Sequence, residues 1–166
     1  TLELAYKVGK ETTAAMGLDY PADAASTVVQ KMVEVFDRKG KRFGKGFYDY
    51  PADATKHLWP GLAEKFPLSE NQPDIEELKK RLLYIQALET ARCYEEGVLT
   101  HPEDGDIGSI FGWGFPPWTG GTMSLIDTVG VADFVAECDR LADAYGDRFK
   151  VSDSLRERAQ QGTSFY

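Results

Sequence analysis

The stretch 106–130 constrains the fold more than any other segment of the sequence, because glycines and prolines interrupt a helical pattern there at close intervals. Residues 103–112 are predicted to form a short helix, which the Phe-Pro-Pro sequence at 115–117 ends. A glycine pair at 120–121 then leads into another helix at about residues 122–129. The sequence therefore predicts a tight corner between two helices, with aromatic side chains at the turn.

The strongest helical pattern lies between Pro73 and Gly97. Proline suits the first turn of a helix, and the acidic residues after it match the positive end of the helix dipole. Apolar residues then recur at three- and four-residue steps on one face, at Ile75, Leu78, Leu82, Ile85, Leu88 and Ala91. Leu83, Ala87 and Tyr94 widen this face, so we expect the helix to lie at the centre of its bundle.

Further helical patterns cover residues 2–16, 24–39, 131–145 and 152–161. Glycines at 17, 40 and 146 are expected to end the first three, and Ser152 to cap the fourth. Asp19-Tyr20-Pro21 is predicted to be extended or a turn. Residues 43–51 suit a short extended turn, from which Phe47 and Tyr48 are predicted to pack into the core. No βαβ pattern is present, and the predicted fold class is all-α.

Size and charge exclude several classes of protein. A chain of 166 residues that is 42% hydrophobic suits one globular domain or two small packed halves. The net charge of −8 argues against binding of nucleic acid, and no apolar run approaches the ~18 residues that membrane insertion requires. Cys93 and Cys138 fall in helical patterns with no signal peptide ahead of them, so a reduced, cytoplasmic protein is expected.

One cluster of positive charge, at residues 38–45, holds five basic side chains in eight residues. It could attract an anion such as a phosphate of CoA. It could also be the solvated end of the preceding helix, where the helix dipole favours cations. We favour the second interpretation.

The patterns that carry catalytic chemistry are missing from the sequence. The glycine pairs at 44–46 and 112–114 fall short of the three glycines of a dinucleotide site. His57 and His101 have neither metal-ligand nor triad spacing. The acidic residues after His101, at 103, 104 and 106, could support it as a base, but such residues at a helix start are first of all partners of the dipole. We therefore assign no catalytic, cofactor-binding or metal-binding residue to this chain.

Glu89 and Arg92 are three residues apart on the long predicted helix, which suits an ion pair. On the surface such a pair contributes roughly 0.2–0.5 kcal/mol. If the pair is buried, Glu89→Ala is expected to cost more.

Two blocks of sequence resemble the C-terminal region of 3-hydroxyacyl-CoA dehydrogenases, and most of all that of the multifunctional fatty-acid oxidation protein. They are Gly44-Lys45-Gly46-Phe47-Tyr48, and the Asp-Ile-Gly, Gly-Phe-Pro-Pro and Gly-Gly elements between 106 and 130. The resemblance implies an all-α helical bundle of the 6-phosphogluconate dehydrogenase C-terminal-like type, built from two related repeats. Residues 1–51 would be the end of an incomplete first repeat, 52–72 a linker, and 73–166 the second repeat.

The resemblance also implies a function. The family oxidises L-3-hydroxyacyl-CoA with NAD in fatty-acid β-oxidation, and its NAD site and catalytic His-Glu pair lie on a Rossmann domain outside this chain. In that family an Asn-Arg pair at the start of the first repeat's long helix helps to form the active site, and that helix would lie upstream of Thr1. The equivalent position of the second repeat, Lys80-Arg81, lacks the Asn. The chain alone is therefore expected to be inactive. The implied partners are the Rossmann and hydratase domains of the same parent chain, acyl-CoA at the domain cleft, and a second copy in a homodimer.

Two alternatives of other classes stay open. The chain could be a non-catalytic scaffold or oligomerisation module that presents helix 75–96 to a partner. It could also be an acyl-CoA-binding module without a dehydrogenase parent.

Overall fold

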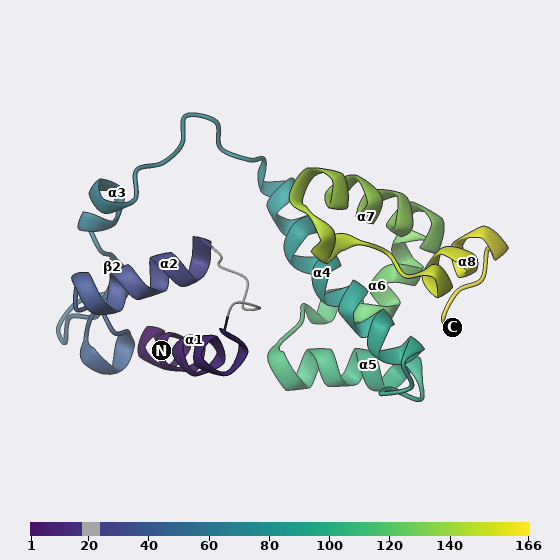
Figure 1. Ribbon diagram of the computed structural model, residues 1–166, viewed down its shortest axis with the longest axis horizontal. Helices are drawn as coiled ribbons and strands as arrows, with labels where there is room; N and C mark the ends of the chain where they lie inside the picture. Colours follow the sequence, from purple (N-terminus) through teal and green to yellow (C-terminus); the bar gives the residue numbers. More distant parts are fainter. Residues whose placement is uncertain (18–23) are drawn as a thin grey trace. The chain divides into compact units, whose positions relative to one another are not determined.

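The computed structural model describes residues 1–17 and 24–166 and divides the chain into two compact units, Thr1–Gln72 and Pro73–Tyr166 (Figure 1). Most of these residues lie in helices, which confirms the predicted all-α class. No helix in the described residues is long and apolar enough to cross a membrane. The turn predicted at Asp19-Tyr20-Pro21 lies outside the described residues.

The first unit begins with two helices that contact each other. Its helical elements are α1 (Leu2–Met16), α2 (Ala24–Gln30), the π-helical turn η2 (Lys31–Val35), the 3-10 turn η3 (Lys41–Phe43) and α3 (Gly61–Lys65). The bounds of α1 agree with the prediction. The helix predicted to reach residue 39 ends at Val35 instead, because Asp37 adopts a left-handed φ of 49° and the N–H of Arg38 turns back to the carbonyl of Met32.

A buried arginine holds the turn that follows. Strands β1 (Tyr48–Asp49) and β2 (His57–Leu58) pair antiparallel, with Tyr48 opposite Leu58. The Arg38 side chain donates from Nε to the carbonyl of Gly46 at 2.6 Å, pairs with Asp49, and lies 4.5 Å from the Trp59 ring. A guanidinium that is 7% exposed is thus surrounded by acceptors and an aromatic face.

The core of the first unit is small. Met32 and Val33 are buried, and the ring of Phe36 lies 5.4 Å from that of Trp59 and 6.1 Å from that of Phe66. The region 52–72, which the sequence suggests as a linker, therefore contains β2 and α3 and packs within this unit. The prediction that Tyr48 packs into the core is wrong, because its side chain is 37% exposed at the end of a two-stranded ribbon, whereas Phe47 is half-buried.

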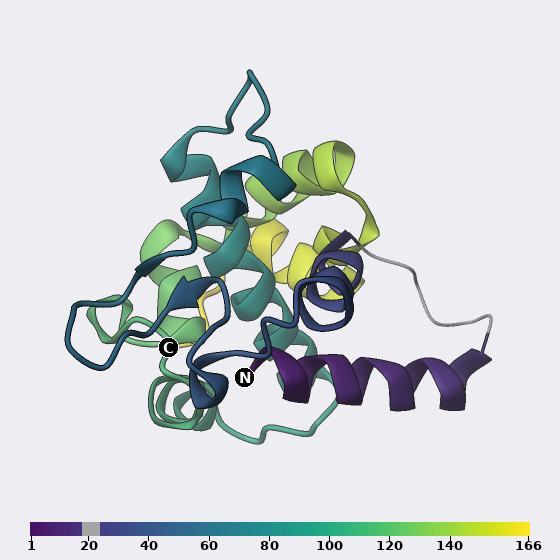
Figure 2. The same ribbon diagram turned by 90° about the vertical axis from the view of Figure 1, so that its left-hand side faces the viewer.

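The second unit is built around α4, which contacts α5, α6 and α7 (Figure 2). Its elements are α4 (Ile75–Glu95), α5 (Pro102–Gly108), the π-helical turn η4 (Ser109–Trp113), the 3-10 turn η5 (Pro117–Thr119), α6 (Thr122–Val129), α7 (Val131–Tyr145), the 3-10 turn η6 (Asp147–Phe149) and α8 (Asp153–Gln161). The predictions for α4, α6 and α7 are confirmed. Ser152 caps α8 as predicted, accepting a hydrogen bond from the N–H of Leu155.

Helix α4 buries only one of its two apolar faces. Tyr84, Ala87, Leu88 and Ala91 point into the core, where the Tyr84 ring stacks on Phe134 at 4.7 Å. The opposite face carries Ile75, Leu78 and Leu82, which are 66%, 38% and 66% exposed. The prediction that Leu78 and Leu82 are buried is therefore wrong, because they face away from α5, α6 and α7.

Candidate functional site

The buried carboxylate of Asp106 organises the corner that the sequence predicts. Asp106 is 5% exposed and accepts hydrogen bonds from the backbone N–H of Met123 at 2.6 Å and of Ser124 at 3.1 Å. These are the first free donors of α6, so the side chain from α5 caps a helix that begins sixteen residues later at Thr122. The Ser124 hydroxyl also donates to this carboxylate. Asp106 is therefore fully occupied as an acceptor.

Gly121 makes this contact possible. It adopts a φ of 119°, and a Cβ at this position would lie 2.4 Å from Oδ1 of Asp106. Gly105 has a similar effect on α5, since a Cβ there would meet the Thr90 side chain at 2.8 Å. Gly105, directly before the Asp-Ile-Gly element, and Gly121 of the Gly-Gly element thus let α4, α5 and α6 approach closely.

A second carboxylate, Asp127 of α6, holds the last residues of the structure. It accepts the backbone N–H of Phe165 at 2.9 Å and of Tyr166 at 3.0 Å. The Tyr166 hydroxyl donates to Asp106 at 2.8 Å, and burial, with this hydrogen bond, raises the pKa of Tyr166 above its usual range. Tyr166 therefore stays protonated and acts as a structural donor.

An open pocket of about 430 Å³ lies beside this corner, between α4 and α5. Thr90, Gly105 and Ser109, all buried, form its floor. Gln86 and Cys93, about two turns apart on α4, form a half-buried wall. A pocket of this size can hold an apolar group of a small molecule or of a protein.

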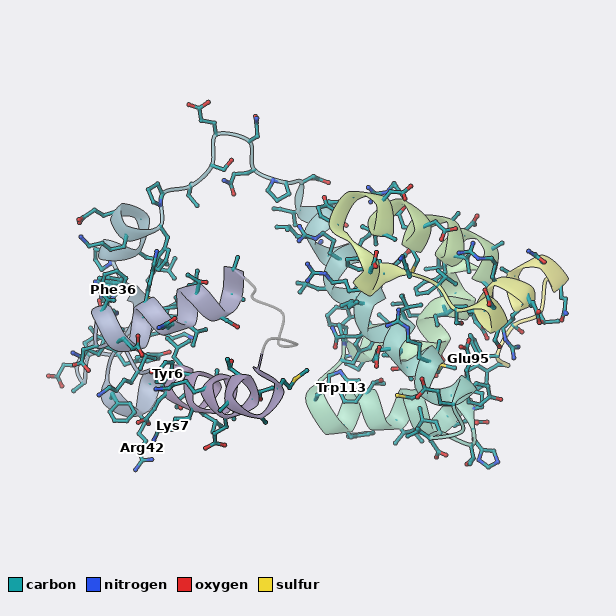
Figure 3. All side chains as sticks on the ribbon, in the orientation of Figure 1. Tyr6, Lys7, Phe36, Arg42, Glu95 and Trp113 are labelled. Atoms are coloured by element: carbon teal, nitrogen blue, oxygen red, sulfur yellow. The ribbon has the colours of Figure 1, made fainter. Side chains whose placement is uncertain are left out.

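The rim of the pocket is exposed and carries two acidic side chains. Val98 and Trp113 are 69% and 59% exposed, and the Trp113 indole N–H donates to Oε1 of Gln86 at 2.8 Å (Figure 3). Glu89 and Asp104 complete the rim, and the lining contains no lysine or arginine among the described residues. The lining itself therefore offers no cation to an anionic ligand, and the nearby Arg92 is already paired with Glu89 at the rim.

The two thiols differ in their surroundings. Cys93 lines the pocket and is half-buried, whereas Cys138 is fully buried on α7. Burial raises the pKa of the Cys138 thiol to about 12, with a smaller contribution from Asp139. Cys138 is therefore a core residue and an unreactive thiol.

The histidines and the acidic residues after His101 do not form one site. Nδ1 of His101 lies 3.7 Å from the Asp104 carboxylate and 3.0 Å from the Thr100 hydroxyl, while Asp106 is turned into the α6 cap. His57 lies in the other unit, 3.7 Å from Asp49. Within residues 1–17 and 24–166, no group of three or more His, Cys, Asp or Glu side chains is arranged to hold a metal.

The ion pair predicted between Glu89 and Arg92 forms, at 2.8 Å, and it lies on the surface, with Glu89 64% exposed. Arg92 also donates to the carbonyl of Lys150 at 2.7 Å. Nearby, Glu95 of α4 (labelled in Figure 3) accepts from Ser152 at 2.8 Å. Arg92 and Glu95 thus tie α4 to the segment between η6 and α8.

The five basic side chains at 38–45 lie in three different environments. Arg38 is the buried clamp described above, so the solvated-end interpretation is wrong for it. Lys39 and Lys45 pair with Asp37 at 3.2 and 2.8 Å, and these hydrogen bonds, Lys45 first, lower the pKa of Asp37. Lys41 and Arg42 are exposed, and Arg42 points away from its unit (Figure 3).

Sequence reasoning missed the pocket and the tail contacts. The pocket depends on the distance between α4 and α5, which periodicity does not give. The contact of Tyr166 with Asp106 joins residues sixty positions apart in the chain. The one signal in the sequence for the buried Asp106 carboxylate was the Gly120-Gly121 pair before α6, because Gly121 contacts Asp106.

Comparison with known proteins gives a consistent set of relatives. The chain is 41% identical over 134 residues to the fatty acid oxidation complex subunit alpha of Shewanella loihica, an alignment that covers 78% of this chain and 19% of that protein. It is 33% identical over 183 residues to the protein of the same name from Vibrio campbellii, which covers 99% of this chain and 25% of that protein. No protein-family profile matches the chain. The chain thus spans about a fifth to a quarter of the length of these relatives.

Proposed function

We propose, from the homology of this chain to the fatty acid oxidation complex alpha subunits, that it is the C-terminal region of an NAD-dependent L-3-hydroxyacyl-CoA dehydrogenase of fatty-acid β-oxidation. The observation that carries the proposal is the similarity along almost the whole chain to a short stretch of much longer relatives. In this proposal NAD binds outside the chain, on a Rossmann domain of the same parent. The chain packs against that domain and helps to form the acyl-CoA cleft.

The geometry of the second unit agrees with a supporting role. Asp106, Ser124 and Tyr166 saturate one another with hydrogen bonds, so none of them is poised to move a proton. The close approaches at Gly105 and Gly121 fix α4, α5 and α6 against each other. A rigid helical support of this kind could hold the wall of a cleft in a fixed position. The two free thiols suit the cytoplasm, where the parent enzyme would act.

The test uses the natural reading frame that contains this chain. The full-length product and the isolated chain are assayed for reduction of NAD⁺ with an L-3-hydroxyacyl-CoA. We expect activity in the full-length protein and none in the isolated chain. A folded full-length protein that binds NAD but does not oxidise the substrate would contradict the proposal.

Acyl-CoA titration into the isolated chain separates the proposal from the acyl-CoA-binding module. The proposal predicts no saturable binding to the chain alone, because the rest of the cleft is absent. Tight binding by the isolated chain, in calorimetry, would favour the module.

A further inference from the structure

The pocket between α4 and α5 contains open space that the packing of the unit does not explain. Gly108 lines the pocket, and a Cβ at this position would meet no atom of the described residues within 4 Å. Gly105, one turn earlier on α5, differs, because a Cβ there would meet the Thr90 side chain at 2.8 Å. Close packing of the helices therefore requires glycine at 105 and leaves empty space at 108.

The backbone at Gly108 does not require glycine either. Its φ of −61° and ψ of −41° are ordinary helical values, and the chain continues into η4 without a break, so this glycine does not end a helix. Glycine weakens a helix relative to alanine because it loses more conformational freedom on folding. Glycine also lets a ligand approach the backbone closely. The empty space at Gly108 therefore points to a ligand.

The polar side chains around this space donate their hydrogen bonds within the protein. The Thr90 hydroxyl donates to the carbonyl of Gln86 at 3.0 Å. The Ser109 hydroxyl donates to the carbonyl of Asp106 at 2.9 Å. The Gln86 amide donates to a carbonyl one turn earlier on α4 and accepts from the indole N–H of Trp113, which is labelled in Figure 3. A ligand that needs a hydrogen-bond donor would have to displace one of these contacts.

Charge does not attract a ligand to the pocket. At the rim, Glu89 is paired with Arg92 at 2.8 Å, and Asp104 lies 3.7 Å from His101. No lysine or arginine of the described residues lines the pocket. A charged group that entered would lose its hydration without gaining an ion pair. The lining therefore favours an uncharged group.

We propose that the pocket between α4 and α5 binds the uncharged, apolar group of a small molecule, such as an alkyl chain or a ring. The group lies over Gly108, on the buried floor formed by Thr90 and Ser109, and contacts the wall at Cys93. The pocket volume of about 430 Å³ falls within the range of about 300–1,000 Å³ that is usual for small-molecule sites. This inference does not depend on the proposed dehydrogenase function, which places acyl-CoA in a cleft that other domains complete.

The test uses 1-hexanol and 1,6-hexanediol as probes, which differ only in a second hydroxyl group. Binding to the whole chain is followed in NMR by the shift of the Trp113 indole N–H, and the backbone amide shifts map the contact. We expect saturable shifts with hexanol in α4 and α5. Hexanediol should bind more weakly by about tenfold or more, because its second hydroxyl would be buried without a donor to pair with.

Two leucine substitutions test the location. Gly108→Leu should place its side chain in the empty space and weaken hexanol binding by about tenfold or more. Gly112→Leu is the matched control, because a Cβ there would also meet no atom of the described residues within 4 Å, and Gly112 is not part of the lining. This variant should bind hexanol as the unchanged chain does. Circular dichroism checks that both variants are folded, and the comparison of the two probes needs neither of them.

Four results would overturn the proposal. The first is the absence of saturable shifts with hexanol. The second is equal binding of hexanol and hexanediol. The third is a loss of binding in Gly112→Leu as large as that in Gly108→Leu. The fourth is calorimetric binding of hexanol to the full-length product of the reading frame that Gly108→Leu leaves unchanged, since another part of the parent chain would then fill the pocket.

Discussion

Single residues in the second unit carry contacts that reach far along the chain. The carboxylate of Asp106 joins α5 to the start of α6 and to Tyr166, and Asp127 joins α6 to the same terminal segment. Each of these carboxylates accepts several N–H or O–H donors, which is how buried or half-buried acids are stabilised. The contacts of Asp106 require glycine at position 121, because a Cβ there would collide with the Asp106 side chain.

We predict that Gly121→Ala destabilises the second unit by roughly 2–4 kcal/mol. Its φ of 119° is unfavourable for an L-residue, and the new Cβ would lie 2.5 Å from Cα of Asp106, a backbone atom that cannot move aside cheaply. Urea unfolding followed by circular dichroism measures the loss.

Gly162→Ala is the matched control for that substitution. Gly162 also has a positive φ, 66°, but no atom lies within 4 Å of the position that an added methyl group would take, so only the backbone cost of about 1–2 kcal/mol remains. Similar losses for the two variants would show that Asp106 does not crowd position 121.

At the scale of elements, two contacts hold α4 and α7 to the C-terminal segments of the second unit. Arg92 of α4 reaches the carbonyl of Lys150, and Arg156 of α8 binds both carboxylate oxygens of Asp139 of α7 at 2.8 Å. The first contact uses a neutral acceptor and the second a charged one. They should therefore respond differently to substitution and to pH.

We predict that Arg92→Ala costs about 1–2 kcal/mol, whereas Glu89→Ala costs no more than roughly 0.5 kcal/mol. Glu89 is exposed and only pairs with Arg92, but Arg92 also satisfies the Lys150 carbonyl. Chemical denaturation of the two variants measures the difference. Equal losses would place the stabilising contact in the ion pair and not in the carbonyl contact.

The Asp139–Arg156 pair predicts a dependence on acid. The hydrogen bond from Arg156 lowers the pKa of Asp139, so the pair's stabilisation is present above the ordinary Asp pKa of about 3.9 and is lost as the pH falls through the lowered value. Both side chains are more than a third exposed, so the contribution is below about 1 kcal/mol. Arg156→Gln should remove it.

Urea unfolding at a series of pH values measures this dependence. The stability difference between the unchanged chain and Arg156→Gln is expected at neutral pH and should shrink as the pH falls below about 3.9. A difference that does not change with pH would show that Arg156 acts through packing alone.

The sequence predicts helices well where glycines end them. Gly17, Gly130 and Gly146 follow α1, α6 and α7, and the bounds of these helices were predicted within a residue. The end of η2 was missed because Asp37, a residue without the freedom of glycine, makes the turn. Periodicity grouped Leu82 with Leu88 and Ala91 on one apolar face, whereas the structure buries only Leu88 and Ala91 and places Leu82 on the opposite face. It could not tell that no described element of the second unit covers that face.

At the scale of the whole chain, the two units differ in how much they bury. The hydrophobic core cluster of the described residues lies entirely in the second unit, from Tyr84 to Leu155. In the first unit α1 has no buried residue, and the packing rests on Met32, Val33 and the aromatic group around Trp59. Stability should therefore be unequal along the chain.

We predict that amide hydrogens of α1 and α2 exchange much faster than those of α4 and α7. Local opening costs little where few apolar groups are buried. Hydrogen exchange with mass spectrometry on the intact chain measures this directly. Equal protection of α1 and α4 would mean that the first unit is stabilised by contacts beyond those within it.

The contrast between the two thiols offers a practical route to several of these experiments. Cys138 is fully buried with its pKa raised to about 12, while Cys93 stands half-buried on the wall of an open pocket. A maleimide dye applied to the folded chain should therefore attach at Cys93 alone. The natural sequence would then carry a fluorescent reporter inside the pocket between α4 and α5, and the entry of any ligand could be timed without altering a residue.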